Sequence, residues 1–210
     1  MQLFGKIEGK TVLDIGCGSG HSLLYMGSRG ASELWGMDLS SKQIEASKGV
    51  LAHQKASTYL FESPMEENPG IPHNYFDIVY SIYALGWTVD LSQTLQHINT
   101  YLKPGGTFIF SWEHPFHDRI TYKDESFVLT KSYNKEGPEW NEAWHLEVLI
   151  YHRKLSTYVN TLIENGFMIE KIIDEVNPYE REPSEDPSKW YSSQKAEWIP
   201  STFIIKSKKV

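Results

Sequence analysis

Residues 11–20 read TVLDIGCGSG, and this stretch decides the fold. An apolar run enters a turn in which Gly16, Gly18 and Gly20 stand at every second position. An apolar run that ends at a glycine-rich turn is typical of a buried strand that stops abruptly. Glycine lets the backbone bend where a Cβ atom would collide, and it lets a ligand approach closely. We therefore predict a strand over residues 11–15, followed by a turn that binds something.

Outward from this turn, strand patterns alternate with helix patterns, which predicts βαβ units and a parallel sheet. The predicted strands cover residues 11–15, 33–38, 58–62, 76–83, 107–112, 167–175 and 202–208. The predicted helices cover residues 19–28, 41–55, 91–102 and 156–164. No helix separates the last two strands, so we expect them to pair antiparallel at the sheet edge. The fold class is therefore α/β, a doubly wound and mostly parallel seven-stranded sheet with an antiparallel last strand.

The length of 210 residues suits a single domain over residues 1–210. The alternation of strand and helix patterns stops at about residues 116–150, which are polar and aromatic. We interpret this stretch as an inserted hairpin or irregular excursion, and we expect it to cover the active site. Residues 177–200 have the composition of a long polar loop.

The overall charge and the cysteine count exclude several classes of function. The net charge is −7, which argues against binding of nucleic-acid phosphates. Cys17 is the one cysteine in the sequence, so we expect no disulfide and no cysteine-based metal site, and we predict no metal. No stretch reaches the roughly 18 apolar residues of a membrane span. We expect a cytoplasmic protein without a membrane partner, and the sequence leaves its oligomeric state open.

Three interpretations of the glycine turn compete. The glycines could simply permit a tight strand-to-helix turn. They could belong to a dinucleotide-binding G-x-G-x-x-G pattern, but His21 stands at the third glycine position and would obstruct close packing. The turn could instead surround an adenosyl ligand without a pyrophosphate. Asp38, at the end of the second strand, could accept hydrogen bonds from both ribose hydroxyls, or it could support the N-terminus of the next helix.

In their order along the chain, these motifs resemble the class I S-adenosylmethionine-dependent methyltransferases. The resemblance rests on VLDIGCGSG (12–20), GMDLS (36–40), FDIVYSIYALGW (76–87) and LKPGGTFIFS (102–111). It extends to HRKLSTYVNTLIENGFMIEKI (152–172) and IPSTFIIK (199–206), which look like the last helix and terminal hairpin of the small-molecule branch. The resemblance covers nearly the whole chain. It implies a seven-stranded sheet whose last strand is inserted antiparallel.

The resemblance implies S-adenosylmethionine as the cofactor and assigns residues to it. Asp14 and the backbone of the glycine turn would hold the methionine part, and Asp38 would take the ribose hydroxyls. Leu39 and Met65 would pack on the adenine, and the backbone of Ser81 would face the amino group. Within the turn, the cysteine is interpreted as a small packing residue. The full set of cofactor-binding residues is Asp14, Gly16, Cys17, Gly18, Gly20, Asp38, Leu39, Met65, Glu66 and Ser81.

The sequence departs from the family pattern in two places. Pro64 stands where the family commonly has an aspartate that reaches the adenine amine, and Glu66 is a candidate to replace it. The family usually carries one or two lid helices before the first strand, whereas about ten residues precede it here. Either residues 116–150 supply the lid, or the site is open.

The resemblance implies methyl transfer to O, N or C of a small, hydrophobic or aromatic molecule. Tyr83 and His114 are candidate catalytic residues, because they follow the fourth and fifth strands at the sheet edge of the glycine turn. His114 could equally be a structural residue held against Pro115 or a backbone carbonyl. Trp112, Tyr133, Trp140 and Trp144 could line an apolar pocket over the cofactor or form the core of the excursion. The alternative function is a catalytically silent module that binds S-adenosylmethionine or S-adenosylhomocysteine as a sensor or scaffold.

Overall fold

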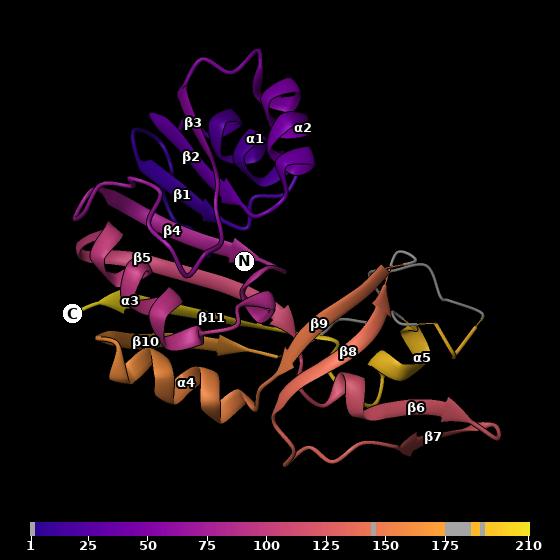
Figure 1. Ribbon diagram of the computed structural model, residues 1–210. Helices are drawn as coiled ribbons and strands as arrows, with labels where there is room; N and C mark the ends of the chain where they lie inside the picture. Colours follow the sequence, from indigo (N-terminus) through magenta and orange to yellow (C-terminus); the bar gives the residue numbers. More distant parts are fainter. Residues whose placement is uncertain (1–2, 144–145, 175–185, 190–191) are drawn as a thin grey trace.

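The computed structural model describes residues 3–143, 146–174, 186–189 and 192–210. Its centre is a seven-stranded sheet in the order β10-β11-β5-β4-β1-β2-β3 (Figure 1). Strands β1 to β5 pair in parallel, whereas β11 runs antiparallel to both β5 and β10. The strands are β1 (Thr11–Ile15), β2 (Glu33–Asp38), β3 (Ser57–Glu62), β4 (Phe76–Ile82), β5 (Leu102–Glu113), β10 (Phe167–Ile173) and β11 (Thr202–Lys209). The predicted fold class is confirmed.

Helices cover both faces of the sheet, so the core has two layers (Figure 1). One layer packs under α1 and α2, and the other packs under α3 and α4. The helices are α1 (His21–Ser28), α2 (Ser41–Leu51), α3 (Leu91–Tyr101) and α4 (Leu155–Glu164). The prediction that α2 reaches residue 55 is wrong. Leu51 is the last buried residue of this helix, and no apolar contact holds a further turn against the sheet.

Strand β5 begins directly after α3, five residues before the predicted start at residue 107. Gly105 has a left-handed φ of +73°, and the β4–β5 register shifts between Phe76 and Ile78. The irregularity accommodates Pro104, Gly105 and Gly106 near the start of β5, and the β4–β5 pairing continues after it. The helix stop at Lys103-Pro104 was therefore predicted correctly, whereas the strand start was not.

The inserted segment forms two antiparallel hairpins. The first pairs β6 (Ile120–Lys123) with β7 (Ser126–Leu129), and the second pairs β8 (Gly137–Ala143) with β9 (Leu146–His152). A short 3-10 helix, η2 (His117–Arg119), leads from β5 into the first hairpin. Both hairpins project from the end of the sheet where β5 stops, and β9 packs against η1, the 3-10 helix of Leu85–Trp87 (Figure 1).

The predicted polar loop 177–200 lies partly outside the described residues, as do Trp144 and residue 175, the predicted end of the strand that forms β10. Where the chain is described again, the four-residue helix α5 (Ser193–Ala196) leads into β11. None of the helices in the described ranges has the length and apolar character that crossing a membrane requires.

Candidate functional site

The strand order places the glycine turn at the switch point of the sheet. After β3 the chain returns to form β4 on the other side of β1, so the connections leaving β1 and β4 diverge. In open α/β sheets, ligands bind outside the carboxyl ends of the strands at such a point. The turn of residues 16–20 lies there, between β1 and α1.

Two glycines of the turn fulfil different physical requirements. Gly16 has a φ of +76°, and a Cβ atom at this position would lie 2.2 Å from the Cβ of Ala84. Gly18 has a φ of +52°, but a Cβ atom there would meet nothing within 4 Å. Gly16 thus allows close packing against the segment that follows β4, whereas Gly18 leaves its backbone open to an approaching ligand.

Asp38 ties the glycine turn to the end of β2. Its Oδ2 accepts a hydrogen bond from the N–H of Gly18 at 2.9 Å, and its Oδ1 accepts one from the N–H of Ser40 at 2.9 Å. The carbonyl of Met37 accepts from the N–H groups of Gly16 and Cys17 at 2.8 and 2.9 Å. A carboxylate has about four lone-pair sites, so Asp38 retains acceptor capacity for two hydroxyls beside the turn.

Asp14 lies beneath the turn and is 1% exposed. Ser22 Oγ donates a hydrogen bond to Asp14 Oδ2, whereas Oδ1 has no partner of ordinary geometry within the described part of the chain. Burial raises the pKa of Asp14 to about 7, against the opposing effect of hydrogen bonds from Ser22 and Tyr80 and with a further increase from Asp38. The sequence did not predict the role of Ser22, although its place in the first turn of α1 is a usable signal.

The two carboxyl groups beside the turn have no cation to neutralise them when they are ionised. Among the described residues, neither Asp14 nor Asp38 forms an ion pair with a lysine or arginine. Two acids that lack a cation, together with an open glycine backbone, suit a positively charged ligand. S-adenosylmethionine carries an ammonium and a sulfonium group, so the residues present fit the expected cofactor.

The expected adenine side of the site has one exposed and one packed residue. Leu39 is 71% exposed directly after Asp38, and Met65 packs against the core beneath Gly16. Glu66 has a structural contact, because its Oε1 accepts from Thr88 Oγ1 at 2.5 Å and from the N–H of Val89 at 2.7 Å. It thereby joins the loop after β3 to the segment before α3.

Two further residues of the expected cofactor site are buried. Ser81 is fully buried near the end of β4, and its Oγ has no hydrogen-bond partner within the described ranges. Cys17 is 6% exposed, and its Sγ would lie 2.9 Å from a Cβ atom placed on Gly36. Burial, reinforced by Asp14 and Asp38, raises the pKa of the Cys17 thiol well above its usual value. The thiol therefore stays protonated, as a packing residue and not a nucleophile.

Tyr83 and His114, the catalytic candidates, are both anchored to the start of β11. Tyr83 has a left-handed φ of +54°, and its hydroxyl hydrogen-bonds to Thr202 Oγ1. The N–H of His114 donates to the carbonyl of Ser201 at 3.0 Å. A left-handed φ in a residue other than glycine, as at Tyr83, is concentrated at functional sites in proteins. The sequence did not predict these anchors, because they join segments more than 80 residues apart, as the separations of 119 and 87 positions indicate.

The contacts of His114 restrict its chemistry. Its Nδ1 accepts a hydrogen bond from the N–H of Phe116 at 3.2 Å, so the neutral ring carries its proton on Nε2. Burial lowers the pKa of His114, while Asp174 acts in the opposite direction. The ring is therefore neutral near pH 7, and Nε2–H can donate a hydrogen bond, whereas the lone pair of Nδ1 is occupied.

The tryptophans differ in their surroundings. Trp112 is 8% exposed, its ring lies 5.6 Å from that of Trp87, and a Cβ atom on Gly86 would collide with it at 1.8 Å. Trp112 therefore packs in the core layer under α3 and α4, and not in a core of the excursion. The space beside Trp112 and His114 measures about 20 Å³, room for a single water molecule. Trp140 is 68% exposed on β8 and packs in neither layer of the core.

Charged residues join the two inserted hairpins. Asp118, Glu139 and His152 bring their ligand atoms within 4.8 Å of one another. Lys131 Nζ already lies 2.6 Å from Glu139 and 3.3 Å from Asp118, and the buried Arg119 approaches the same two carboxylates. With two cations in place, this cluster is an ion-pair network that holds η2, β8 and β9 together.

A second buried pair lies where β5 ends. Glu113 Oε1 is 3.1 Å from Nδ1 of His117, and both residues are buried. Burial raises the pKa of Glu113 to about 8 and lowers that of His117 to about 4. Both groups are thus largely uncharged at pH 7, and the protonated carboxyl can donate to the ring nitrogen.

Comparisons with known proteins agree with this geometry. A family model described as a methyltransferase domain matches residues 1–170. An uncharacterized protein of Haemophilus influenzae is 30% identical over all of this chain and 85% of its own length. The malonyl-[acyl-carrier protein] O-methyltransferase of Salmonella typhimurium is 33% identical, over 48% of this chain and 38% of its own length.

Solved structures extend the comparison to the whole fold. A proposed S-adenosylmethionine dependent methyltransferase from Listeria monocytogenes superposes with a TM-score of 0.81 at 26% identity, covering 100% of this chain and 95% of that one. An S-adenosylmethionine dependent methyltransferase from Mesorhizobium loti has a TM-score of 0.78 at 24% identity, covering 99% and 94%. The second likeness, at this identity, concerns the fold alone.

Proposed function

The chain belongs to the methyltransferase-domain family, as a class I enzyme that uses S-adenosylmethionine, and from this premise we propose that it methylates a small, hydrophobic organic molecule at O, N or C. One observation carries the proposal. Asp14 and Asp38 form no ion pair with a lysine or arginine among the described residues, and both lie by a glycine turn in which the backbone at Gly18 is open to a ligand. This charge distribution supports binding of a positively charged methyl donor at the switch point of the sheet.

We propose that the chain's own residues contribute mainly position and electrostatics. Bound S-adenosylmethionine supplies a methyl group on a positively charged sulfur, which a nucleophile attacks in line. Asp38 would accept hydrogen bonds from the ribose, and Asp14 would favour the cationic end. A cation beside Asp14 would also shift the equilibrium of this carboxyl towards its ionised form. Alignment and exclusion of water account for much of the rate of such a displacement.

The acceptor would react near the ends of β4 and β5, where Tyr83 and His114 are fixed to β11. We propose that Tyr83 positions the acceptor and that His114 donates a hydrogen bond from Nε2–H. A general base is needed only where the acceptor must lose its proton early. The packing of β9 against η1 supports the prediction that the insertion covers this edge of the site.

A small molecule is favoured over a nucleic acid because the net charge is −7, which disfavours contact with a phosphate backbone. Among the relatives, the Salmonella protein is by its name a malonyl-[acyl-carrier protein] O-methyltransferase. An Alkalilimnicola ehrlichii protein, 29% identical over 52% of this chain, is by its name a ubiquinone biosynthesis O-methyltransferase. The first of these names a protein-bound acyl group and the second a biosynthesis of small molecules, so the acceptor class itself requires a test.

The first experiment is a calorimetric titration of the purified protein with S-adenosylmethionine, S-adenosylhomocysteine and NAD. We expect micromolar binding of both adenosyl ligands and no binding of NAD. Failure of both adenosyl ligands to bind would favour a requirement for prior acceptor binding or a scaffold role.

The second experiment tests the acceptor class with methyl-labelled S-adenosylmethionine. The label would be offered to a cell extract that has been separated into small-molecule, RNA and protein fractions. We expect transfer to the small-molecule fraction by the wild-type protein and much slower transfer by Asp38→Ala. Label that appears instead in RNA or protein would overturn the proposed acceptor class.

A further inference from the structure

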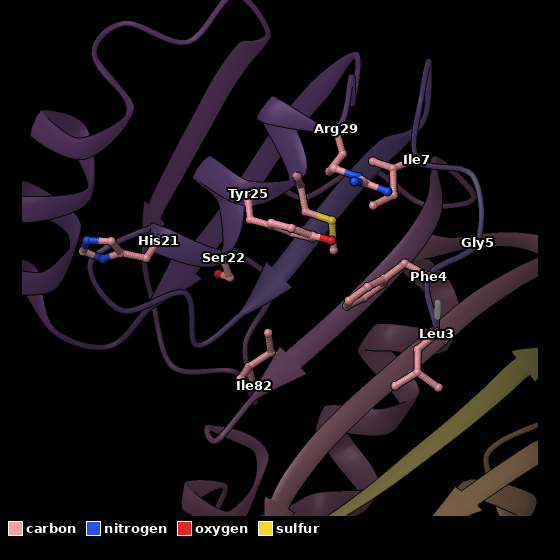
Figure 2. Close-up of a pocket in the computed structure, with 10 residues that line it drawn as sticks. Leu3, Phe4, Gly5, Ile7, His21, Ser22, Tyr25, Arg29 and Ile82 are labelled. Carbon is pink, nitrogen blue, oxygen red and sulfur yellow. The ribbon is translucent and has the colours of Figure 1, made fainter. Parts of the chain in front are cut away.

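A cavity of about 570 Å³ lies between α1 and the N-terminal segment of residues 3–7 (Figure 2). Pockets for small molecules typically measure about 300–1,000 Å³ and have mostly apolar walls. The apolar lining here consists of Leu3, Phe4, Ile7, Tyr25, Met26 and Ile82. None of the residues expected to hold the cofactor belongs to this lining.

One end of the cavity adjoins the candidate site. His21 and Ser22 are the first residues of α1, directly after the glycine turn, and Ile82 is the last residue of β4. Figure 2 shows these three residues at one end, with Arg29 and Ile7 at the other. The eight residues of α1 that run between the ends correspond to about 12 Å. The cavity therefore extends away from the place where the methyl group would be transferred.

The charge of the cavity wall is opposite in sign to that of the whole protein. None of the described residues that line it carries a carboxylate, although the net charge of the chain is −7. Arg29 is exposed, lies 5.9 Å from the ring centroid of Tyr25, and has no ion-pair partner among the described residues. The nearby Lys6, in contrast, pairs with Glu8 at 3.2 Å. An apolar space that ends at an unpaired guanidinium suits a molecule with an apolar body and an anionic end.

On the other side of the candidate site, the space that the described residues leave beside Trp112 and His114 measures about 20 Å³, too little for such a body. An acceptor that reacts at the end of β4 would find space for its remaining atoms along α1.

We propose that this cavity binds the apolar body of the methyl acceptor and that Arg29 binds an anionic group at the end remote from the reacting atom. The inference rests on the proposed function and adds a substrate class, an amphipathic organic acid. The reacting atom would lie near Ile82, where the cavity meets the glycine turn. His21 lies at the same end and would face the reacting part of the acceptor, whereas the hydroxyl of Ser22 stays bonded to Asp14.

The test uses octanoate and 1-octanol as probes, titrated calorimetrically into the protein saturated with S-adenosylhomocysteine. We expect octanoate to bind more tightly than octanol. Arg29→Gln should weaken octanoate about tenfold and leave octanol unchanged, because only the acid has a charge for Arg29 to bind. Lys6→Gln is the matched control, since it removes one exposed positive charge nearby and should change neither affinity.

A second variant, Ile82→Trp, fills the inner end of the cavity from a side chain that is 47% exposed, so the fold should tolerate it. We expect this variant to bind neither probe and to keep its affinity for S-adenosylhomocysteine. Equal effects of Arg29→Gln and Lys6→Gln, absence of octanoate binding to the wild type, or loss of S-adenosylhomocysteine binding in Ile82→Trp would each overturn the inference. The proposed function would fail separately, through label transfer to RNA or protein.

Discussion

The glycine turn of residues 16–20 and the insertion of residues 116–152 lie at the same edge of the sheet, yet different interactions hold them. Backbone hydrogen bonds fix the turn, such as those from Gly16 and Cys17 to the carbonyl of Met37. In the insertion, backbone ladders hold each hairpin, and ion pairs such as that between Lys131 and Glu139 at 2.6 Å join one hairpin to the other. The turn therefore depends on what each residue's backbone permits, and the arrangement of the two hairpins depends on which side chains meet.

The largest effect is expected from adding one methyl group to the glycine turn, which tests whether its backbone conformation stabilises the fold. Gly16→Ala should destabilise the fold by about 3 kcal/mol, since the left-handed backbone and the contact with Ala84 both penalise a Cβ atom. Urea unfolding would measure the change. Gly18→Ala is the control, because it has a left-handed φ but open space around it. We expect Gly18→Ala to cost about 1 kcal/mol and to reduce affinity for S-adenosylhomocysteine instead. Equal destabilisation by both changes would contradict the role given to Ala84.

We also expect the affinity for S-adenosylmethionine to depend on the glycine turn with Asp38 and not on the ion pairs of the insertion. Asp38→Ala should weaken S-adenosylmethionine binding by on the order of 1.5–3 kcal/mol, because it removes hydrogen bonds to a charged acceptor. Lys131→Ala, which removes a central charge of the insertion network, should leave the affinity unchanged. Calorimetry on both variants checks this pair of outcomes. Unchanged affinity in Asp38→Ala would refute its assigned role.

The smallest effect concerns the pH dependence of stability where β5 meets the insertion. Burial raises the pKa of Glu113 to about 8 from 4.5, so the folded protein keeps a proton that the unfolded chain releases. Stability from this group is complete below pH 4.5 and is lost as the pH rises to 8. Between pH 6 and 8, wild type should therefore lose roughly 1–2 kcal/mol more than Glu113→Gln. Denaturant titrations at both pH values measure the difference, and parallel pH profiles would show that Glu113 ionises normally in the fold.

Sequence patterns predicted those features that neighbouring residues determine. The 4, 3, 4 spacing of Leu91, Leu95, Ile98 and Leu102 predicted α3, and TVLDIGCGSG predicted β1 and its turn. Both depend on local periodicity and on residues with special backbone freedom. The predicted antiparallel pairing of the last two strands is confirmed by β10 and β11. The expectation that no helix separates them is wrong, because the four-residue α5 lies between them in the chain.

Other features depend on contacts that no local pattern encodes. The bond between Tyr83 and Thr202 joins positions 119 residues apart, and the one between Glu66 and Thr88 joins the ends of two loops. The strands of the two hairpins have only four or seven residues each, too few for a hydrophobic period to reveal which strands pair. The cavity beside α1 was not predicted either, because its walls come from three separate segments.

The position of β11 between β5 and β10 affects how the protein is made. This strand leaves the ribosome after every other strand of the sheet, and until it does, the edge of β5 has no neighbour on that side. Exposed strand edges pair readily with other chains. The same late strand carries the partners of Tyr83 and His114. A translation product that stops before residue 202 would therefore leave the edge of β5 exposed, and Tyr83 and His114 would lack their partners.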